Sequence, residues 1–269
     1  MPILKTLASN TVDRINARVY HADGIDHLYR PRQMLWRVEA VALLKYHDAF
    51  AGRDVLDIGV GTGRTTAFLA PLCRSYHGID YSPAMIRAMQ RSMPGVETSL
   101  GDMRDMREFA DASFDFVFAP NNVFDAVDHA GRLAALAECR RVLRPGGLLL
   151  FSGHNLGWRH AGAAPALEHT RNPVTQIARL GSWLRRRRNY RHLRPLCSFE
   201  ADHATFCDEG HDFSLLHYYI GQAAQRRQLD DTGFDVVEVL DESGMTLAPD
   251  AEAADSSQLM YAALRRPDA

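Results

Sequence analysis

Ten residues decide the fold of this chain: Asp54-Val55-Leu56-Asp57-Ile58-Gly59-Val60-Gly61-Thr62-Gly63, in which an apolar strand runs directly into a turn with three glycines in five residues. A tight reversal needs backbone angles that glycine adopts readily, and a Cβ in the turn would keep the backbone away from a bound ligand. This pattern predicts the strand, glycine turn and helix with which open α/β sheets bind nucleotides.

The spacing of the glycines separates two classes of ligand. The dinucleotide fingerprint is Gly-x-Gly-x-x-Gly, but here the third glycine comes one residue early, at Gly63, and Arg64 takes the expected place. Asp57 places a carboxylate two residues before Gly59, at the strand end where ligands of such sheets bind. That charge would repel a pyrophosphate and attract a cation, such as the sulfonium and ammonium groups of S-adenosylmethionine. A purely structural tight turn is the alternative interpretation.

A second strand end also carries an acid. The apolar segment Ser75-Tyr76-His77-Gly78-Ile79 ends in Asp80, and Tyr81-Ser82-Pro83 then opens a helix. A carboxylate at this place can accept hydrogen bonds from both hydroxyls of a ribose. The alternative is that Asp80 or Ser82 only caps the helix.

A third strand, expected over residues 96–100, ends in Gly101-Asp102-Met103. Asp102 can accept a hydrogen bond from the exocyclic amine of an adenine, and Met103 can pack near its ring. Gly-Asp by itself is an ordinary turn, so its position after the third strand makes it informative.

Two further strands complete the series. The fourth is expected at 113–119 and leads into Pro120-Asn121-Asn122-Val123. The fifth is expected at 147–151, after a helix over 133–143 and the turn Arg144-Pro145-Gly146-Gly147. Both segments are short and apolar and are bounded by turn residues, as strands are.

In order and spacing, these motifs resemble the class I S-adenosylmethionine-dependent methyltransferases over about residues 38–153, and more weakly after residue 220. The motifs are Asp57-x-Gly59-x-Gly61-x-Gly63, Asp80, Gly101-Asp102, Phe114-Asp115 and Leu143-Arg144-Pro145-Gly146-Gly147. The resemblance implies an α/β fold with a Rossmann-like, mostly parallel seven-stranded sheet, helices on both faces and an inserted lid region after the fifth strand. It also implies S-adenosyl-L-methionine as the cofactor, with these binding residues: Asp57, Gly59, Gly61, Gly63, Asp80, Tyr81, Gly101, Asp102, Met103, Pro120 and Asn121.

The resemblance divides the chain into four parts. We expect an N-terminal cap segment over 1–37, the cofactor-binding core over 38–153, an insertion or lid over 154–218, and a C-terminal helix and β-hairpin over 219–269. The helix is expected at 220–231, and the hairpin strands at 234–240 and 259–264. In the cap segment, Tyr29 and Tyr20 are candidates for an aromatic contact with the cofactor, and core packing is the alternative.

The insertion is expected to define the methyl acceptor. It contains a predicted hairpin, formed by residues 199–206 and 214–219, that would cover the pocket. His154 follows the fifth strand, and it is a candidate base together with His217 and with Asp125 near the fourth strand. For each histidine, a structural hydrogen bond is the alternative. No metal is expected, because the spacing of the cysteines and histidines in the insertion matches no common zinc site.

An arginine-rich segment lies within the insertion. From Arg171 to Arg194 there are eight arginines and no acid, and they include the run Arg185-Arg186-Arg187-Arg188. Ile177, Leu180, Trp183 and Leu184 are spaced as one face of a helix. The segment is either a solvated helix packed by that face or a surface for an anion, such as a phosphate-bearing substrate, an acidic glycan or a lipid. Nucleic acid is disfavoured because the chain as a whole has a net charge of −2 and shows no recognisable reading module.

Composition agrees with a compact enzyme, since 46% of the residues are apolar. The N-terminus does not resemble a signal peptide, and four cysteines without Cys-x-x-Cys spacing fit a reducing compartment, so a cytoplasmic location is expected. Arginine outnumbers lysine 29 to 2, which is typical of a GC-rich genome, so a bacterial source is expected. The leading hypothesis is methyl transfer to a small-molecule, glycan or lipid-linked acceptor, with oxygen favoured. Pro120-Asn121-Asn122-Val123 departs from the Asn/Asp-Pro-Pro-Tyr/Phe run of enzymes that methylate amide or nucleobase nitrogen. An NAD(P)-dependent oxidoreductase and a non-catalytic cofactor-binding relative are the alternatives, and the oligomeric state is open.

Overall fold

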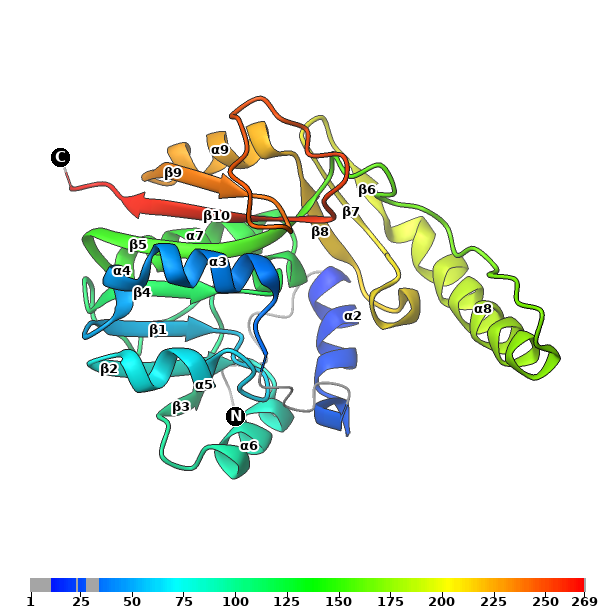
Figure 1. The fold of residues 1–269 in the computed structure, drawn as a ribbon, viewed down its shortest axis with the longest axis horizontal. Helices are drawn as coiled ribbons and strands as arrows, with labels where there is room; N and C mark the ends of the chain where they lie inside the picture. Colours follow the sequence, from blue (N-terminus) through cyan, green and yellow to red (C-terminus); the bar gives the residue numbers. More distant parts are fainter. Residues whose placement is uncertain (1–10, 23, 28–33, 269) are drawn as a thin grey trace.

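The structure is a computed structural model that describes residues 11–22, 24–27 and 34–268. Ten strands form one sheet (Figure 1). They are β1 (Asp54–Ile58), β2 (Ser75–Asp80), β3 (Thr98–Leu100), β4 (Phe114–Ala119), β5 (Leu143–Asn155), β6 (Ser198–Phe199), β7 (His203–Phe206), β8 (His217–Ile220), β9 (Phe234–Leu240) and β10 (Gln258–Arg265). The order is β3-β2-β1-β4-β5-β8-β7-β6, with β10 also paired to β5 and β9 paired to β10.

Seven of these strands make the predicted sheet, in the order β3-β2-β1-β4-β5-β10-β9. The first five run parallel, and β10 is antiparallel to both of its neighbours. The predicted number of seven strands was too low, because β6, β7 and β8 extend the sheet. His154 of β5 pairs with Gln258 of β10 on one side and with Tyr219 of β8 on the other. Strands β8, β7 and β6 therefore lie on the same side of β5 as β4, beyond the end of β4.

Helices cover both faces of the sheet, as the resemblance implied. The α-helices are α2 (Thr11–Tyr20), α3 (Arg37–Lys45), α4 (His47–Phe50), α5 (Thr66–Leu69), α6 (Pro83–Ser92), α7 (His129–Val142), α8 (Pro173–Leu193) and α9 (Gln222–Asp231). Short 3₁₀ helices are η1 (Ile25–His27), η2 (Ala70–Leu72), η3 (Val123–Ala126), η4 (Arg194–Leu196) and η5 (Gly210–Phe213).

Two apolar cores lie on the two faces of the sheet. Successive strand residues point to opposite faces, so Val55 packs with α3, α4 and α5, whereas Leu56 packs with α7 and α9. Both side chains are fully buried. Because both faces are covered, the strands are apolar on both sides, and this explains the continuous apolar runs in the sequence.

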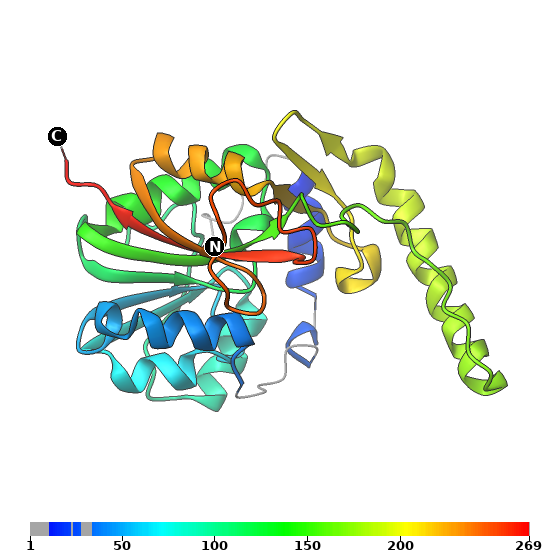
Figure 2. The ribbon, with the colours of Figure 1, turned by 45° about the horizontal axis from the view of Figure 1, so that its top comes forward.

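The predicted boundaries of the insertion fall inside strands. Strand β5 continues to Asn155, and β8 spans residues 217–220, so the proposed limits at 154 and 218 divide two elements that pair with each other. Helix α9 therefore begins at Gln222 rather than at residue 220. The predicted hairpin is present, since β7 pairs antiparallel with β8. Helix α2 stands across the carboxyl ends of the parallel strands, and α8 projects away from the sheet (Figures 1 and 2).

Candidate functional site

A cavity of about 1120 Å³ opens at the carboxyl ends of β1 to β4. The residues that directly follow these strands all line it: Gly59, Tyr81, Gly101 and Pro120. Helix α2 supplies another part of the wall. Pockets for one drug-sized ligand span roughly 300–1,000 Å³, so this cavity has room for a nucleoside cofactor and a second small molecule.

The three glycines of the turn have two different functions. Gly59 and Gly61 line the cavity with positive φ angles of 72° and 55°. A Cβ at Gly61 would meet nothing within 4 Å, whereas one at Gly59 would overlap Val123. Gly63 (φ 90°) does not line the cavity, and a Cβ there would overlap Met89 of α6. The third glycine is therefore required for helix packing, and its predicted contact with a cofactor is not supported.

Asp80 lies at the cavity, at the end of β2, and is 7% exposed. Its Oδ2 accepts a hydrogen bond from the Gly61 backbone N–H (2.9 Å), and its Oδ1 accepts one from the Ser82 N–H (2.8 Å). Burial raises the pKa of Asp80 to about 6, although these two donors favour the charged form. Each carboxylate oxygen keeps a lone pair, so the side chain can still accept hydrogen bonds from a ligand.

Asp57 is fully buried beneath the turn and does not line the cavity. Its Oδ2 accepts hydrogen bonds from the hydroxyls of Tyr76 (2.7 Å) and Thr65 (3.3 Å). Burial raises the pKa of Asp57 to about 7, against the effect of these two donors. Its Oδ1 has no hydrogen-bond partner within the described part of the chain. Asp57 therefore does not line the cavity, and its interaction with the cofactor, directly or through water, stays a prediction.

Asp102 connects the third strand end to the N-terminal helix. Its carboxylate pairs with Arg104, with Nη2–Oδ2 at 2.7 Å and Nε–Oδ1 at 2.9 Å. Arg104 also forms an ion pair with Asp13 of α2. All three side chains line the cavity, as do the predicted residues Gly101 and Met103. Sequence reasoning missed Arg104 and Asp13, because an ion pair between residues 91 positions apart has no local signal.

Helix α2 is fastened over the site by polar contacts. Asn16 is 1% exposed, and its Nδ2 donates to the carbonyl oxygens of Ala126 and Leu216, both at 2.7 Å. Its Oδ1 accepts from the Leu216 N–H at 3.0 Å. Ser82 Oγ donates to the carbonyl of Tyr20 (2.7 Å). One residue of α2 therefore joins the core to the insertion next to the cavity.

The loop after β4 forms the rest of the predicted site. Pro120 and Asn121 line the cavity, and so does Asn122. Asn121 and Asn122 have positive φ angles of 56° and 58°, which asparagine tolerates better than most residues. Asn122 N–H donates to Ser152 Oγ at 2.8 Å. Of the predicted aromatic contacts, Tyr20 lines the cavity, whereas Tyr29 lies outside the described residues.

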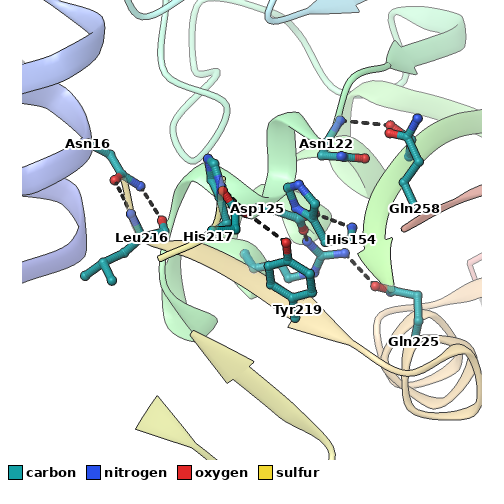
Figure 3. Close-up of polar contacts among 12 residues, drawn as sticks. Asn16, Asn122, Asp125, His154, Leu216, His217, Tyr219, Gln225 and Gln258 are labelled. Carbon is teal, nitrogen blue, oxygen red and sulfur yellow. Dashed lines mark hydrogen bonds and ion pairs between the residues drawn. The ribbon is translucent and has the colours of Figure 1, made fainter. Parts of the chain in front are cut away.

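Two histidine–carboxylate pairs lie near the end of β5, and Figure 3 shows His154, Asp125 and His217 there. His154 Nδ1 is 2.8 Å from Asp125 Oδ2, and His217 Nδ1 is 2.8 Å from Asp208 Oδ2. The two rings stack with centroids 5.0 Å apart. Although burial opposes it, the charge of Asp208 raises the pKa of His217. Neither histidine lines the cavity, so the predicted candidates cluster beyond its wall.

Asp125 is not a free base. It is fully buried, forms an ion pair with the equally buried Arg132, and accepts hydrogen bonds from both the backbone N–H and Nδ1 of His154. Arg132 also donates to Gln225 (2.5 Å) and Gln228 (3.0 Å) of α9. The assignment of Asp125 as a base was therefore wrong, because its oxygens already hold partners. An arginine on the apolar face of α7 was the signal that sequence reasoning overlooked.

The same cluster contains the three potential metal ligands that the described residues bring together: His154, Asp208 and His217. Their ligand atoms lie within 4.8 Å of one another. The imidazole planes are only 24° apart and stacked, and each Nδ1 already bonds a carboxylate. Metal ions bind in the plane of an imidazole at roughly 2.0–2.1 Å. The arrangement is that of two hydrogen-bonded pairs, and the absence of a metal stays a prediction.

Comparisons with known proteins agree with this geometry. Residues 55–147 match the methyltransferase domain family. A probable S-adenosylmethionine-dependent methyltransferase of Mycolicibacterium smegmatis is 36% identical over 106 residues, 39% of each chain. Over residues 55–147 the chain is therefore similar to the S-adenosylmethionine-dependent methyltransferases. The methyl donor of this class is S-adenosylmethionine, and the matches give no support to an oxidoreductase.

The proteins with similar sequences carry names that refer to different reactions. A demethylmenaquinone methyltransferase of Beutenbergia cavernae is 37% identical over 121 residues, 44% of this chain and 46% of that one. The chain thus spans less than half of the length of either relative. Among solved structures, the CcbJ methyltransferase from Streptomyces caelestis aligns with a TM-score of 0.62 and 17% identity, over 93% of this chain and 98% of its own, and it shows the same fold.

Proposed function

We propose that this protein binds S-adenosylmethionine in the cavity and transfers its methyl group to a small-molecule, glycan or lipid-linked acceptor. The observation that supports the proposal is that Gly59, Gly61 and Asp80 lie together at one end of the cavity. The cavity is large enough for two ligands, and these residues belong to the segment that matches a methyltransferase domain. Four residues that follow neighbouring strand ends converge on this space.

The described residues fit the cofactor at three points. The open space above Gly61 can receive the methionine part, and the free Oδ1 of Asp57 can accept a hydrogen bond from its ammonium group through water. Asp80 has lone pairs for both ribose hydroxyls. Asp102 and Met103 are placed for the adenine, with the Asp102 carboxylate shared with Arg104.

When bound, S-adenosylmethionine supplies an electrophilic methyl group on a positively charged sulfur. The protein has to align the acceptor for in-line displacement and exclude water. Orientation of this kind contributes roughly 7–11 kcal/mol to lowering a barrier. Asn121 and Asn122, with α2 on another side, border the space that the acceptor would occupy.

We favour oxygen as the acceptor atom and keep His154 as the candidate base; because His154 lies outside the cavity wall, it would take the acceptor's proton through a bridging water. Asp125 holds Nδ1 of His154 and is the positioning residue. In the neutral tautomer with a proton on Nδ1, the Nε2 lone pair of His154 is free to accept a proton. His217 is placed next to it, where its paired imidazole can orient a polar acceptor. A cytoplasmic location fits the four free cysteines.

Calorimetric titration of the full chain with S-adenosylhomocysteine tests the cofactor site. We expect Asp80→Ala to weaken binding by roughly 10- to 100-fold, because charge-assisted hydrogen bonds to the ribose are lost. Asp48→Ala, at a fully exposed carboxylate, is the matched control and should bind normally. Equal affinity of Asp80→Ala and the parent protein would remove the ribose assignment. Mass spectrometry of small-molecule, glycan and lipid fractions incubated with labelled cofactor would then identify the acceptor class.

A further inference from the structure

Helix α8 is an arm that leaves the body of the molecule (Figures 1 and 2). Its carboxyl-terminal part packs against the body, where Leu193 and Tyr190 join a cluster with Phe213 and Leu216. Farther toward its amino-terminal end it contacts the preceding loop, where Trp183 Nε1 donates to the carbonyl of Pro165 (3.1 Å) and Arg179 pairs with Glu168. The amino-terminal part, from Pro173 onward, lies farthest from the sheet (Figure 2). The helix is thus anchored at one end and projects at the other.

The projecting part of α8 exposes large apolar side chains. Val174 is 76% exposed, Ile177 is 72% exposed, Leu180 is 42% exposed and Leu184 is 55% exposed. Their spacing of three, three and four residues places them on one face of the helix. This stripe is about 15 Å long at 1.5 Å per residue. Exposed apolar side chains in a row mark a contact surface rather than a solvated helix.

The same face continues as arginine toward the body. Arg188 and Arg191 follow Leu184 at intervals of four and three residues, so they extend the stripe, and both are exposed. Neither has a carboxylate partner among residues 11–22, 24–27 and 34–268. Arg185 and Arg186 differ, because they pair with Asp212 and Glu209 of the insertion. Two arginines of the run, Arg185 and Arg186, are therefore held by the insertion, whereas Arg188, together with Arg191 beyond the run, extends the apolar stripe.

We propose that this face of α8, defined by Val174, Ile177, Leu180, Leu184, Arg188 and Arg191, docks the protein on a lipid bilayer that contains anionic lipids. A bilayer supplies hydrocarbon for the apolar side chains and phosphates for the guanidinium groups next to them. Arginine suits this place because it pairs with phosphate in bidentate geometry. Helix α8 projects away from the sheet, so its amino-terminal part lies apart from the body of the molecule (Figure 2). The inference is independent of methyl transfer.

A nucleic acid would use the arginines but would leave the apolar stripe in water. A second copy of the chain would cover the apolar stripe but would have to provide carboxylates for the arginines. The bilayer is the occupant that satisfies both halves of the face at once. The other two occupants are outcomes of the experiment.

Co-sedimentation of the full chain with vesicles tests the proposal, using phosphatidylcholine mixed with phosphatidylglycerol against phosphatidylcholine alone. We expect binding to the anionic vesicles that weakens as salt is added. Arg188→Gln with Arg191→Gln should lower the partition coefficient on the order of 20-fold, from about fivefold per basic residue. Val174→Ser with Ile177→Ser should lower it roughly tenfold or more, since apolar burial is lost.

Matched controls come from exposed residues elsewhere. Leu44→Ser, at a leucine that is 79% exposed, and Arg107→Gln, at an arginine side chain that is 82% exposed, should bind vesicles like the parent protein. Calorimetry with S-adenosylhomocysteine should be unchanged in all variants, which separates loss of docking from loss of the proposed cofactor site.

Three results would overturn the docking proposal. The first is equal partition into neutral and anionic vesicles. The second is vesicle binding that survives both α8 double variants. The third is a dimer in light scattering that Val174→Ser with Ile177→Ser abolishes, because the stripe would then contact a second copy of the chain. Tighter binding to single-stranded DNA than to anionic vesicles would also count against it.

Discussion

The carboxylates of Asp57 and Asp80 are buried next to a site proposed for a cationic ligand, and this gives the ligand-free protein a specific pH dependence. Burial raises their pKa values to about 7 and about 6. Between about pH 4 and pH 7 the folded state then binds more protons than the unfolded state, so the free energy of unfolding falls as the pH rises. A bound cation favours the charged forms of Asp57 and Asp80 and so reduces this loss of stability.

We expect Asp57→Asn to remove much of that dependence. An uncharged amide can still accept the Tyr76 hydrogen bond, so the variant should be more stable than the parent at pH 8, on the order of 3 kcal/mol, and similar to it near pH 4. Urea unfolding of the ligand-free protein from pH 4 to pH 8 measures the difference. Asp48→Asn is the exposed control. If Asp57→Asn kept the parent slope, the raised pKa of Asp57 would be refuted.

A second test at the residue scale concerns the half-buried His154 and its buried partner Asp125. With an identified acceptor, we expect His154→Gln to lower kcat by about 10²–10⁴-fold, because a positioned base is lost. The affinity for S-adenosylhomocysteine should stay at the parent value. His160→Gln, at an exposed histidine of the same segment, should leave kcat unchanged. A lower melting temperature with normal kcat would assign His154 to structure alone.

At the scale of elements, α2 matters because it closes the site through few contacts. Asn16 satisfies three backbone groups of Ala126 and Leu216 at once. We expect Asn16→Ala to lower the affinity for S-adenosylhomocysteine roughly tenfold, since leaving buried groups unpaired costs about 1–3 kcal/mol. Stopped-flow dissociation should show a faster off-rate. Thr11→Ala, at an exposed residue of the same helix, is the control, and an equal off-rate in both variants would show that α2 does not retain the ligand.

At the scale of the whole molecule, a ligand that binds only the folded state stabilises it by mass action. S-adenosylhomocysteine at 100 times its Kd should add about 2.7 kcal/mol. For a chain of this size we expect Tm to rise by roughly 5–10 °C. NAD at the same concentration should leave Tm unchanged, which checks the remaining oxidoreductase alternative. A shift with NAD and none with S-adenosylhomocysteine would contradict the proposed function.

The whole molecule also combines two surfaces of different character. The cofactor site is enclosed by the sheet and α2, whereas the apolar and basic face of α8 lies on the projecting arm (Figure 1). In the part of the chain that the structure describes, no helix has the length and apolar character needed to span a membrane. The proposed docking of α8 on anionic lipids is an interfacial contact, and we expect it to be reversible and sensitive to salt.

The sequence by itself determined the order of the parallel strands and the place of the site. Strand periodicity, the glycine turn and the acids at 80 and 102 are signals carried by neighbouring residues, and parallel strands present their carboxyl ends at one edge. The resemblance to a known family depends on these same local motifs. For that reason Asp80, Tyr81, Gly101, Met103, Pro120 and Asn121 all line the cavity where they were predicted.

Only the tertiary structure decided which side chains are free to act. Gly63 turned out to serve packing against Met89, and Asp125 to be held by Arg132. The pairing of β8 with β5, and the Asn16 contacts of α2, depend on residues tens to hundreds of positions apart. The physical reason is that burial, ion pairing and hydrogen-bond saturation belong to contacts between distant segments, and a linear pattern of residue types does not specify those contacts.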